Sequence, residues 1–257
     1  MNSEFAELLR HHGWQSFDSI WARSADAAIA KNLRTDRVTL RFTLDDRGAE
    51  RSFYIKRHIR SSWKEYVKPL LRLTWPILGA RNEWNAILDF HSVGLRTMTP
   101  VAFGEAGTDS FLITEGLEDC TKLSDLIANE PAASDLAGAV RSRLIDQIAS
   151  LARTMHGAGL HHQDFYLGHL LLSNSDDTRL YIIDLGRVQK RRRLSRRWII
   201  KDLAQLNFSA TTLLPDERLR FLRHYLGRSL QSSDRTLIDR IKSKTASIGR
   251  HSRKNRL

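Results

Sequence analysis

Two short apolar runs, each next to an aspartate, constrain this chain most. The first run, Leu170-Leu171-Leu172, follows a polar loop that carries Asp164. The second run, Leu180-Tyr181-Ile182-Ile183, leads directly into Asp184-Leu185-Gly186. Runs of this length and composition predict two strands. Two strands that deliver one carboxylate each to the same cleft suit phosphoryl transfer, in which one carboxylate orients a hydroxyl and the other holds a metal ion.

The spacing within the polar loop is that of a kinase catalytic loop. His162 and Asp164 form a His-x-Asp pair, and His169 stands five residues after the aspartate, at a ligand position. Asp184 and Gly186 match the Asp-x-Gly metal motif. We therefore expect Asp164 to be the catalytic carboxylate and Asp184 to bind the metal. His162 and Gly186 are expected to be structural.

A lysine and a glutamate precede this loop in the order that a kinase uses. Alternating runs over residues 37–44 and 52–57 predict a strand, a turn and a strand, and Lys56 follows an apolar pair on the second strand. Residues 80–91 have helical spacing, with Glu83 in the first turn. Taken alone, each residue has a simpler interpretation: Lys56 as a solvated lysine at a strand end, and Glu83 as a carboxylate favoured by a helix N-terminus. Their order is what indicates a phosphate-contacting lysine held by a glutamate.

Other segments predict the surroundings of these residues. Runs over 101–104 and 111–116 predict a hairpin that ends where a kinase binds adenine through backbone hydrogen bonds, with Glu115 and Leu117 as candidates. Residues 57–79 predict an inserted basic helix, either at a membrane interface or packed on the protein with a solvated face. Residues 1–34 are expected to be helical, and the basic tail 242–257 to be frayed and able to dock on anionic lipid.

The charge balance favours an anionic partner. The chain has 257 residues, a net charge of +12 and a pI near 10.2. Much of the excess follows Asp184, where a kinase receives its acceptor. The arginines expected to bind an anionic acceptor, with a plain surface patch as the alternative, are Arg187, Arg191, Arg192, Arg196 and Arg197. Asp202, farther on, is expected to brace the catalytic loop. Without a recognised nucleic-acid motif, we expect no nucleic-acid partner.

Cysteine usage and hydropathy bear on the compartment. The single cysteine, Cys120, excludes an internal disulfide and favours a reducing compartment. The first ten residues contain Glu4 and Glu7 and no long apolar run, so we expect no signal peptide. No stretch of about eighteen apolar residues exists to span a membrane.

With these residues placed, the chain resembles the lipopolysaccharide kinase family of Gram-negative bacteria, the Kdo and heptose kinases of the inner core. The resemblance covers residues 38–210 and is closest to the heptose I kinase branch. It is most specific in four segments, Phe53–Arg57, Pro76–Trp84, His162–His169 and Ile183–Arg187, with Trp198 and Lys201–Leu203 beyond them.

The resemblance implies an α+β, protein-kinase-like bilobal fold, with a small β-rich lobe over residues 1–116 and a mostly helical lobe over 117–257. It implies ATP and Mg²⁺ as cofactors, with His169 as a further phosphate or metal contact, and phosphorylation of an inner-core heptose or Kdo. The partners expected are the lipopolysaccharide inner-core glycolipid and the anionic inner-membrane surface. Whether the basic surface also recruits an acidic protein is left open. The protein is then expected to be cytoplasmic and peripheral to the inner membrane.

Three departures from the kinase pattern keep alternatives open. Gln163 stands where most such kinases have arginine, and His169 stands where protein kinases have asparagine. Residues 34–44 contain no glycine, so ordinary strand backbone would cover the nucleotide. The alternatives are a pseudokinase that binds without transferring phosphate, and a kinase of another small-molecule or protein acceptor at the membrane surface.

Overall fold

The computed structural model describes residues 1–23, 28–34, 37–59, 79–129 and 135–254. The chain forms two compact units, one of residues 1–89 and 98–118 and the other of residues 90–97 and 119–257. Residues 90–97, which the sequence leaves in the first lobe, belong to the second unit because they bond to its strands. Ile182 N–H donates to Arg96 O at 3.0 Å, and the Thr97 hydroxyl donates to Ile182 O at 2.5 Å.

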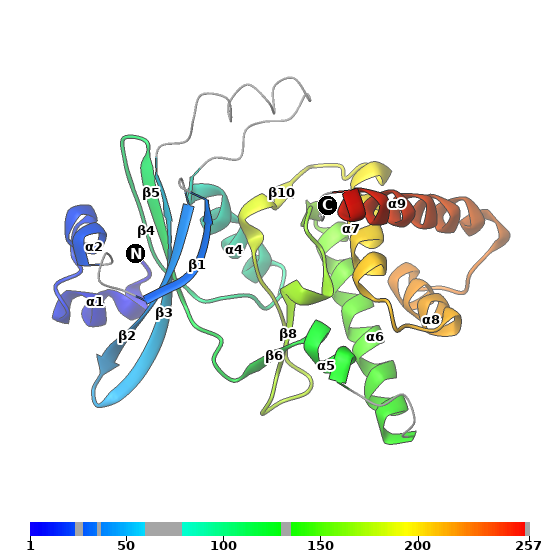
Figure 1. Cartoon of the computed structure of the whole chain (residues 1–257), viewed down its shortest axis with the longest axis horizontal. Helices are drawn as coiled ribbons and strands as arrows, with labels where there is room; N and C mark the ends of the chain where they lie inside the picture. Colours follow the sequence, from blue (N-terminus) through cyan, green and yellow to red (C-terminus); the bar gives the residue numbers. More distant parts are fainter. Residues whose placement is uncertain (24–27, 35–36, 60–78, 130–134, 255–257) are drawn as a thin grey trace. The chain divides into compact units, whose positions relative to one another are not determined.

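The first unit is built on a five-stranded antiparallel sheet in the order β1-β2-β3-β5-β4 (Figure 1). Its strands are β1 (Ala28–Arg34), β2 (Arg37–Asp46), β3 (Ala49–His58), β4 (Pro100–Ala106) and β5 (Asp109–Glu115). The predicted strand pair and hairpin are confirmed. β1 corrects the expectation that residues 1–34 form a short helical entry. β1 is an edge strand, and its pairing with β2 contains two register shifts. Because each shift interrupts the two-residue period, apolar and polar residues do not alternate regularly along β1.

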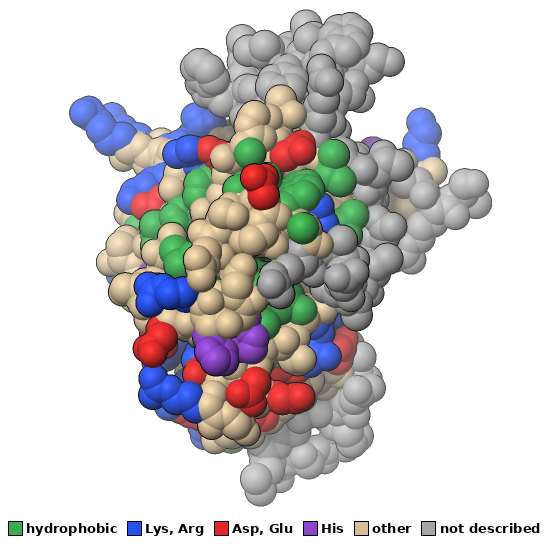
Figure 2. All heavy atoms as spheres, turned by 90° about the vertical axis from the view of Figure 1, so that its left-hand side faces the viewer, with side chains coloured by type: hydrophobic (Ala, Val, Ile, Leu, Met, Phe, Trp, Pro, Cys, Tyr) green, Lys and Arg blue, Asp and Glu red, His purple; other side chains and the backbone are tan. Residues whose placement is uncertain are grey.

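Short helices pack against this sheet. The 3-10 turn η1 (Ser3–Phe5) and helices α1 (Ala6–His11) and α2 (Phe17–Arg23) precede β1. Phe5 of η1, Leu9 of α1 and Trp14, between α1 and α2, are buried in the same core as Phe53 and Ile55 of β3. Figure 2 shows the side of the molecule that carries these helices, where basic and acidic side chains are mixed. This face does not account for the basic excess of the chain.

Helix α4 (Arg81–Ser92) confirms the predicted helix over residues 80–91. It begins after Gly79, whose φ of +73° lies in the left-handed region that glycine adopts freely. The backbone N–H of Ala80 donates to the Ser110 hydroxyl at 3.0 Å, which ties the start of the helix to β5. Ile87 and Phe90 form its buried face, and Glu83 lies in its first turn.

The second unit combines small sheets with long helices (Figure 1). Strands β6 (Cys120–Lys122), β8 (Leu170–Ser173) and β9 (Leu180–Ile182) form one sheet, and β7 (Leu160–His161) pairs with β10 (Gln189–Lys190). The helices are α5 (Leu123–Asn129), α6 (Asp135–Gly157), α7 (Arg196–Ser209), α8 (Pro215–Leu226) and α9 (Arg235–Lys254). Three 3-10 turns complete it: η3 (Leu167–His169), η4 (Leu185–Arg187) and η5 (Ser232–Asp234). The two strands predicted from the apolar runs are confirmed as β8 and β9.

The C-terminal segment corrects a further expectation. Residues 242–254 are not frayed but form the greater part of α9, which packs on α7. Ile238, Ile241 and Ile248 recur at helical spacing along α9, and Ile241 is buried. The Thr245 hydroxyl also donates to Ala204 O of α7 at 3.3 Å. This apolar stripe holds the helix despite its basic composition.

Two segments with sequence-based expectations lie partly outside the described residues. Most of the inserted basic helix expected over 57–79 falls on residues 60–78, which the structure does not describe. In the glycine-free stretch 34–44, residues 35 and 36 are likewise not described. Among the helices that are described, none combines the length and the apolar character needed to cross a bilayer.

Candidate active site

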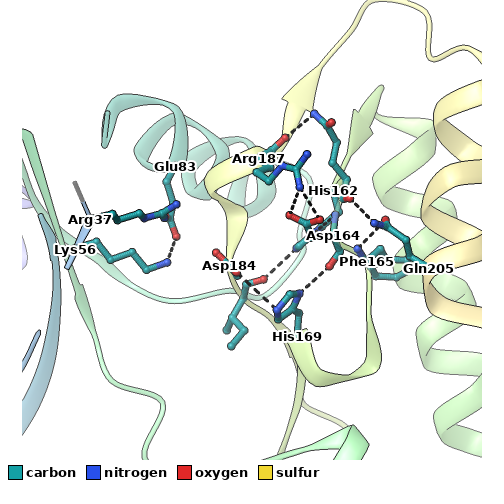
Figure 3. A network of polar contacts seen from close by, with 12 residues as sticks. Arg37, Lys56, Glu83, His162, Asp164, Phe165, His169, Asp184, Arg187 and Gln205 are labelled. Atoms are coloured by element: carbon teal, nitrogen blue, oxygen red, sulfur yellow. Dashed lines mark hydrogen bonds and ion pairs between the residues drawn. The ribbon is translucent and has the colours of Figure 1, made fainter. Parts of the chain in front are cut away.

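In the first unit, β3 and α4 bring Lys56 and Glu83 together, as the sequence predicts (Figure 3). Lys56 Nζ contacts Glu83 Oε1, and Arg37 Nη2 lies 3.3 Å from Glu83 Oε2. The Glu83 side chain is only 1% exposed, and these two cations compensate its charge. The motif order did not predict Arg37. The strand register could have done so, because Thr39 of β2 pairs with Lys56 and Arg37 lies on the same face two residues earlier.

The two predicted adenine contacts lie at the end of β5, also in the first unit. The Glu115 carboxylate pairs with Arg51, whose Nη2 and Nε atoms lie 2.6 and 3.0 Å from Oε1. The Glu115 backbone N–H donates to Thr99 O at 3.0 Å. The Glu115 side chain and N–H are therefore occupied, so in the predicted adenine contact only the Glu115 carbonyl and the Leu117 N–H would take part.

In the second unit, the catalytic loop is held by the imidazole of His162. The ring is fully buried, with Nε2 at 3.0 Å from Ile183 O and Nδ1 accepting from the Asp164 N–H at 3.2 Å. These partners require a neutral ring with its proton on Nε2. Burial lowers the pKa of His162, which keeps the ring neutral. The His162 ring thus links the backbone of Asp164 to that of Ile183, the residue before Asp184. These contacts are structural, which is the role expected for His162.

One polar stripe of α7 binds the backbone of the same loop. Asp202 accepts from the N–H groups of His162 and Gln163 at 2.7 and 2.9 Å. Burial raises the pKa of Asp202, but the hydrogen bond from His156 and these backbone bonds outweigh it, so the net shift is downward. The carboxylate therefore stays ionised although it is fully buried.

Two further residues on this stripe are not among the predicted site residues. Gln205 Nε2 donates to Gln163 O at 2.6 Å, and its Oε1 accepts from the Phe165 N–H at 3.3 Å. The Ser209 hydroxyl accepts from the Leu167 N–H at 2.9 Å. Their offsets from Asp202 of three and seven residues place all three on one helix face, and that spacing was the available signal.

The carboxylate of Asp164 is paired with Arg187 (Figure 3). Arg187 Nη1 lies 3.0 and 3.1 Å from the two carboxylate oxygens. The Arg187 backbone is fixed in turn, because Gln163 Nε2 donates to its carbonyl at 2.8 Å. Gln163 adopts φ of +70°, which is strained for a residue with a Cβ, and its bonds to Asp202 and Gln205 hold it there.

Asp184 and His169 face each other across 3.7 Å, from Oδ2 to Nε2. His169 Nδ1 lies 2.7 Å from Asp164 O, so Nδ1 carries a proton and donates to that carbonyl. Asp184 adopts the left-handed conformation, with φ of +61°, at the start of η4, the turn that contains Gly186. Carboxylate oxygen suits Mg²⁺ and imidazole nitrogen suits it less. Of the two residues, Asp184 is thus the one that would hold a magnesium ion.

The predicted acceptor arginines differ in their surroundings. Arg187 faces Asp164, and Arg191 and Arg197 lie over the ring of Trp198. Arg192 and Arg196 are exposed. From residue 187 to residue 201 the sequence has eight lysines and arginines and no acid. This segment is the basic surface nearest in sequence to the catalytic loop.

Comparisons with known proteins agree with this arrangement. The model of the lipopolysaccharide kinase (Kdo/WaaP) family matches residues 18–225. The lipopolysaccharide core heptose(I) kinase WaaP of Pseudomonas aeruginosa is 39% identical over 207 residues, which cover 76% of this chain and 75% of that protein. The enzyme of the same name from Escherichia coli is 36% identical over 243 residues, covering 90% and 88%.

Solved structures show the same fold. A structure of WaaP in complex with acyl carrier protein matches with a TM-score of 0.72 and 32% identity, over 93% of this chain and 95% of that one. An aminoglycoside-3'-phosphotransferase of type VIII matches with a TM-score of 0.52 and 16% identity, over 89% and 98%, which is a likeness of fold alone. The predicted kinase-like fold is confirmed. Since the family model spans most of the sequence and the relatives match over most of their length, the chain belongs to the lipopolysaccharide kinase (Kdo/WaaP) family.

Proposed function

We propose that this protein transfers the γ-phosphoryl group of ATP to a hydroxyl of an inner-core heptose of lipopolysaccharide. The observation that carries the proposal is the Asp164 carboxylate, held by Arg187 and placed on a loop that Asp202 braces. The names of the relatives supply the acceptor class, because they are heptose(I) kinases.

Each predicted residue then has a role in positioning or charge neutralisation, the two contributions on which phosphoryl transfer depends. Lys56, held by Glu83, contacts the α- and β-phosphates of ATP. The Glu115 carbonyl and the Leu117 N–H bind adenine. Asp164 accepts a hydrogen bond from the acceptor hydroxyl and orients its oxygen toward the γ-phosphorus.

Asp184 would hold Mg²⁺, with His169 beside it as a weaker metal contact or as a hydrogen-bond partner of phosphate or water. The ion would neutralise charge on the phosphate oxygens as the bond to the leaving group breaks. Arg187, the residue that orients Asp164, is exposed enough, at 56%, to meet an anionic acceptor as well.

The acceptor is a glycolipid, so we place the reaction at the cytoplasmic face of the inner membrane, with the protein peripheral to it. The basic segment over residues 187–201 supports this placement. Lysines and arginines near an anionic surface contribute about 1 kcal/mol each to membrane binding.

The test uses defined acceptors that differ by one sugar. The protein is incubated with ATP, Mg²⁺ and either a core glycolipid ending in heptose or one truncated to Kdo, and the products are mapped by mass spectrometry and phosphorus NMR. Phosphate on heptose alone supports the proposal. Phosphate on Kdo in both acceptors would replace it with the Kdo alternative, and ATP binding without any transfer would favour the pseudokinase.

A carrier protein is a second partner that the fold can accommodate. The WaaP structure was solved with acyl carrier protein, and here residues of α7, α8 and α9 line an open, mostly apolar pocket of about 360 Å³. Leu203, Leu206, Leu222 and Ile241 are among its lining residues. A pocket of this kind can take the acyl chain that such a carrier presents.

The sequence of α9 has seven lysines and arginines and one acid, which suits an acidic carrier surface. The proposal predicts that acyl-loaded carrier binds and raises the melting temperature, whereas carrier without an acyl group binds more weakly. If the acyl-loaded and unloaded carriers bind equally well, the pocket does not take part in the interaction. If neither form binds, the carrier is not a partner.

A further inference from the structure

The ring of Trp198, in the first turn of α7, gathers three positive charges. The guanidinium carbons of Arg197 and Arg191 lie 4.8 and 5.6 Å from the ring centre, and Lys201 Nζ lies 5.5 Å from it. A cation over an indole face is attracted by the negative face of the ring. Trp198 therefore holds like charges near one another that would otherwise separate.

A buried histidine supports this tryptophan. The rings of His161 and Trp198 are stacked, with centroids 4.4 Å apart and planes inclined by 21°. Burial lowers the pKa of His161 to about 4, and the charges of Arg191 and Lys201 add to the shift. The imidazole is therefore neutral at physiological pH and does not repel the cations. Its two nitrogens make no hydrogen bond with any residue that the structure describes, so the ring serves as a flat support.

The backbone fixes Arg191 beside this stack. β10 pairs with β7, so Gln189 lies opposite His161, and the Arg191 N–H then donates to Gly159 O at 2.9 Å. Gly159 has φ of +77°, and a Cβ there would lie 2.1 Å from Arg191 O. Only glycine permits this approach. One guanidinium donor of Arg191 goes to Gln189 Oε1 at 3.0 Å, which leaves the others for a ligand.

The cluster of Trp198, Arg191, Arg197 and Lys201 is joined to the catalytic loop. Lys201 Nζ donates to Gln163 Oε1 at 3.3 Å, and Gln163 is the residue whose amide binds the Arg187 carbonyl. Within the described part of the chain, the cluster's two arginines and its lysine form no ion pair with a carboxylate. No described carboxylate is therefore in direct contact with these cations, although the charges of Asp164 and Asp202 act on Lys201 at longer range.

We propose that this cluster is a subsite for an oxyanion, a carboxylate or a phosphate, on the acceptor next to the sugar that is phosphorylated. A guanidinium stacked by its face keeps the N–H groups of its edge free, and that edge matches an oxyanion. Trp198 orients the arginines for this contact in advance, so less side-chain entropy is lost when the acceptor binds. The assignment rests on the proposed function, because it concerns the same acceptor.

The test compares Arg197→Gln with Arg193→Gln. Arg193 is exposed in the same basic run and contacts no ring that the structure describes. Loss of a charge-assisted contact should raise the KM for the acceptor about tenfold or more in Arg197→Gln. The KM for ATP should not change, and Arg193→Gln should behave as the wild type. An equal rise in both variants would show unspecific attraction and overturn the subsite.

Modified acceptors identify the anion. The KM of the wild type and of Arg197→Gln is measured with an acceptor whose carboxyl groups are reduced and with one whose phosphates are removed. The two proteins should have the same KM for whichever acceptor lacks the oxyanion that the cluster binds. If Arg197→Gln keeps its full deficit on both, the subsite is wrong.

Direct binding separates this proposal from the proposed function. Calorimetry with de-acylated acceptor oligosaccharide needs no turnover. If the wild type transfers no phosphate but Arg197→Gln still weakens oligosaccharide binding relative to Arg193→Gln, the subsite stands and the reaction is wrong. Equal binding by both variants would overturn the subsite.

Discussion

Arg187 Nη1 donates to both carboxylate oxygens of Asp164, at 3.0 and 3.1 Å, from three residues beyond Asp184. The turn that carries Asp184 therefore also supplies the group that orients Asp164. Gln163 binds the Arg187 carbonyl, so the backbone of this turn and the catalytic loop are tied by a neutral hydrogen bond. The two carboxylates are coupled through the positions of their backbones.

Replacing Lys56 should impair ATP use more than stability. Lys56→Met removes the proposed phosphate contact, and we expect kcat/KM for ATP to fall about 100-fold or more. Arg37→Met is the matched control, because Arg37 meets the other oxygen of the same buried Glu83. If the two variants lose equal activity, Lys56 only stabilises Glu83 and does not contact the nucleotide.

Asp202→Asn should destabilise the second unit. An amide cannot accept from both loop N–H groups as the carboxylate does, and it carries no charge to strengthen those bonds. We expect a loss of about 2–5 kcal/mol in the free energy of unfolding, measured with urea, together with loss of activity. Asp239→Asn, at an exposed position of α9, should cost under about 0.5 kcal/mol. A small effect at Asp202 would contradict its role as a brace.

Gly159→Ala and Gly138→Ala should have opposite effects on stability. At Gly159 a Cβ meets Arg191 O at 2.1 Å and φ is positive, so we expect a loss of about 1–3 kcal/mol and weaker acceptor binding. At Gly138, in α6, a Cβ meets nothing within 4 Å, and alanine should stabilise by up to about 1 kcal/mol. Thermal unfolding measures both, and stabilisation by Gly159→Ala would refute the close approach of the Arg191 carbonyl.

Stability should fall on acidification partly through His161. Its pKa is about 4 in the folded protein and near 6.5 when unperturbed, so the unfolded chain binds its proton first as the pH falls. The contribution is fully present above pH 6.5 and is lost between pH 6.5 and 4. His161→Phe keeps an aromatic ring against Trp198 without a titrating group. Its unfolding free energy should depend less on pH in that window, and an unchanged pH dependence would argue against a buried neutral His161.

The sequence predicted the elements that short-range patterns encode. Apolar alternation located β2 and β3, and helical spacing located α4, so the contact between Lys56 and Glu83 followed from motif order. In residues 162–169, the spacing of His162, Asp164 and His169 was enough to predict a catalytic loop. The expectation that Asp202 braces the loop came from its position in the same pattern, and Asp202 accepts the His162 N–H in the structure.

Contacts that depend on tertiary placement were not predictable in this way. Arg37 meets Glu83 only through the register of β2 and β3, and His161 meets Trp198 only once β7 and α7 are packed. β1 has no alternation of its own, and its pairing with β2 defines it. The many basic residues of α9 led to the expectation that its second half is frayed, although Ile238, Ile241 and Ile248 recur at helical spacing.

The most direct test of the central claim is phosphate transfer from γ-labelled ATP to heptose-containing core glycolipid, with the wild type and Asp164→Asn side by side. Asparagine keeps the size of the side chain but cannot orient the hydroxyl as a carboxylate does. The account predicts label on the glycolipid with the wild type, a loss of about 100-fold to 10,000-fold with Asp164→Asn, and equal ATP binding by both. Transfer by Asp164→Asn at the wild-type rate would contradict it.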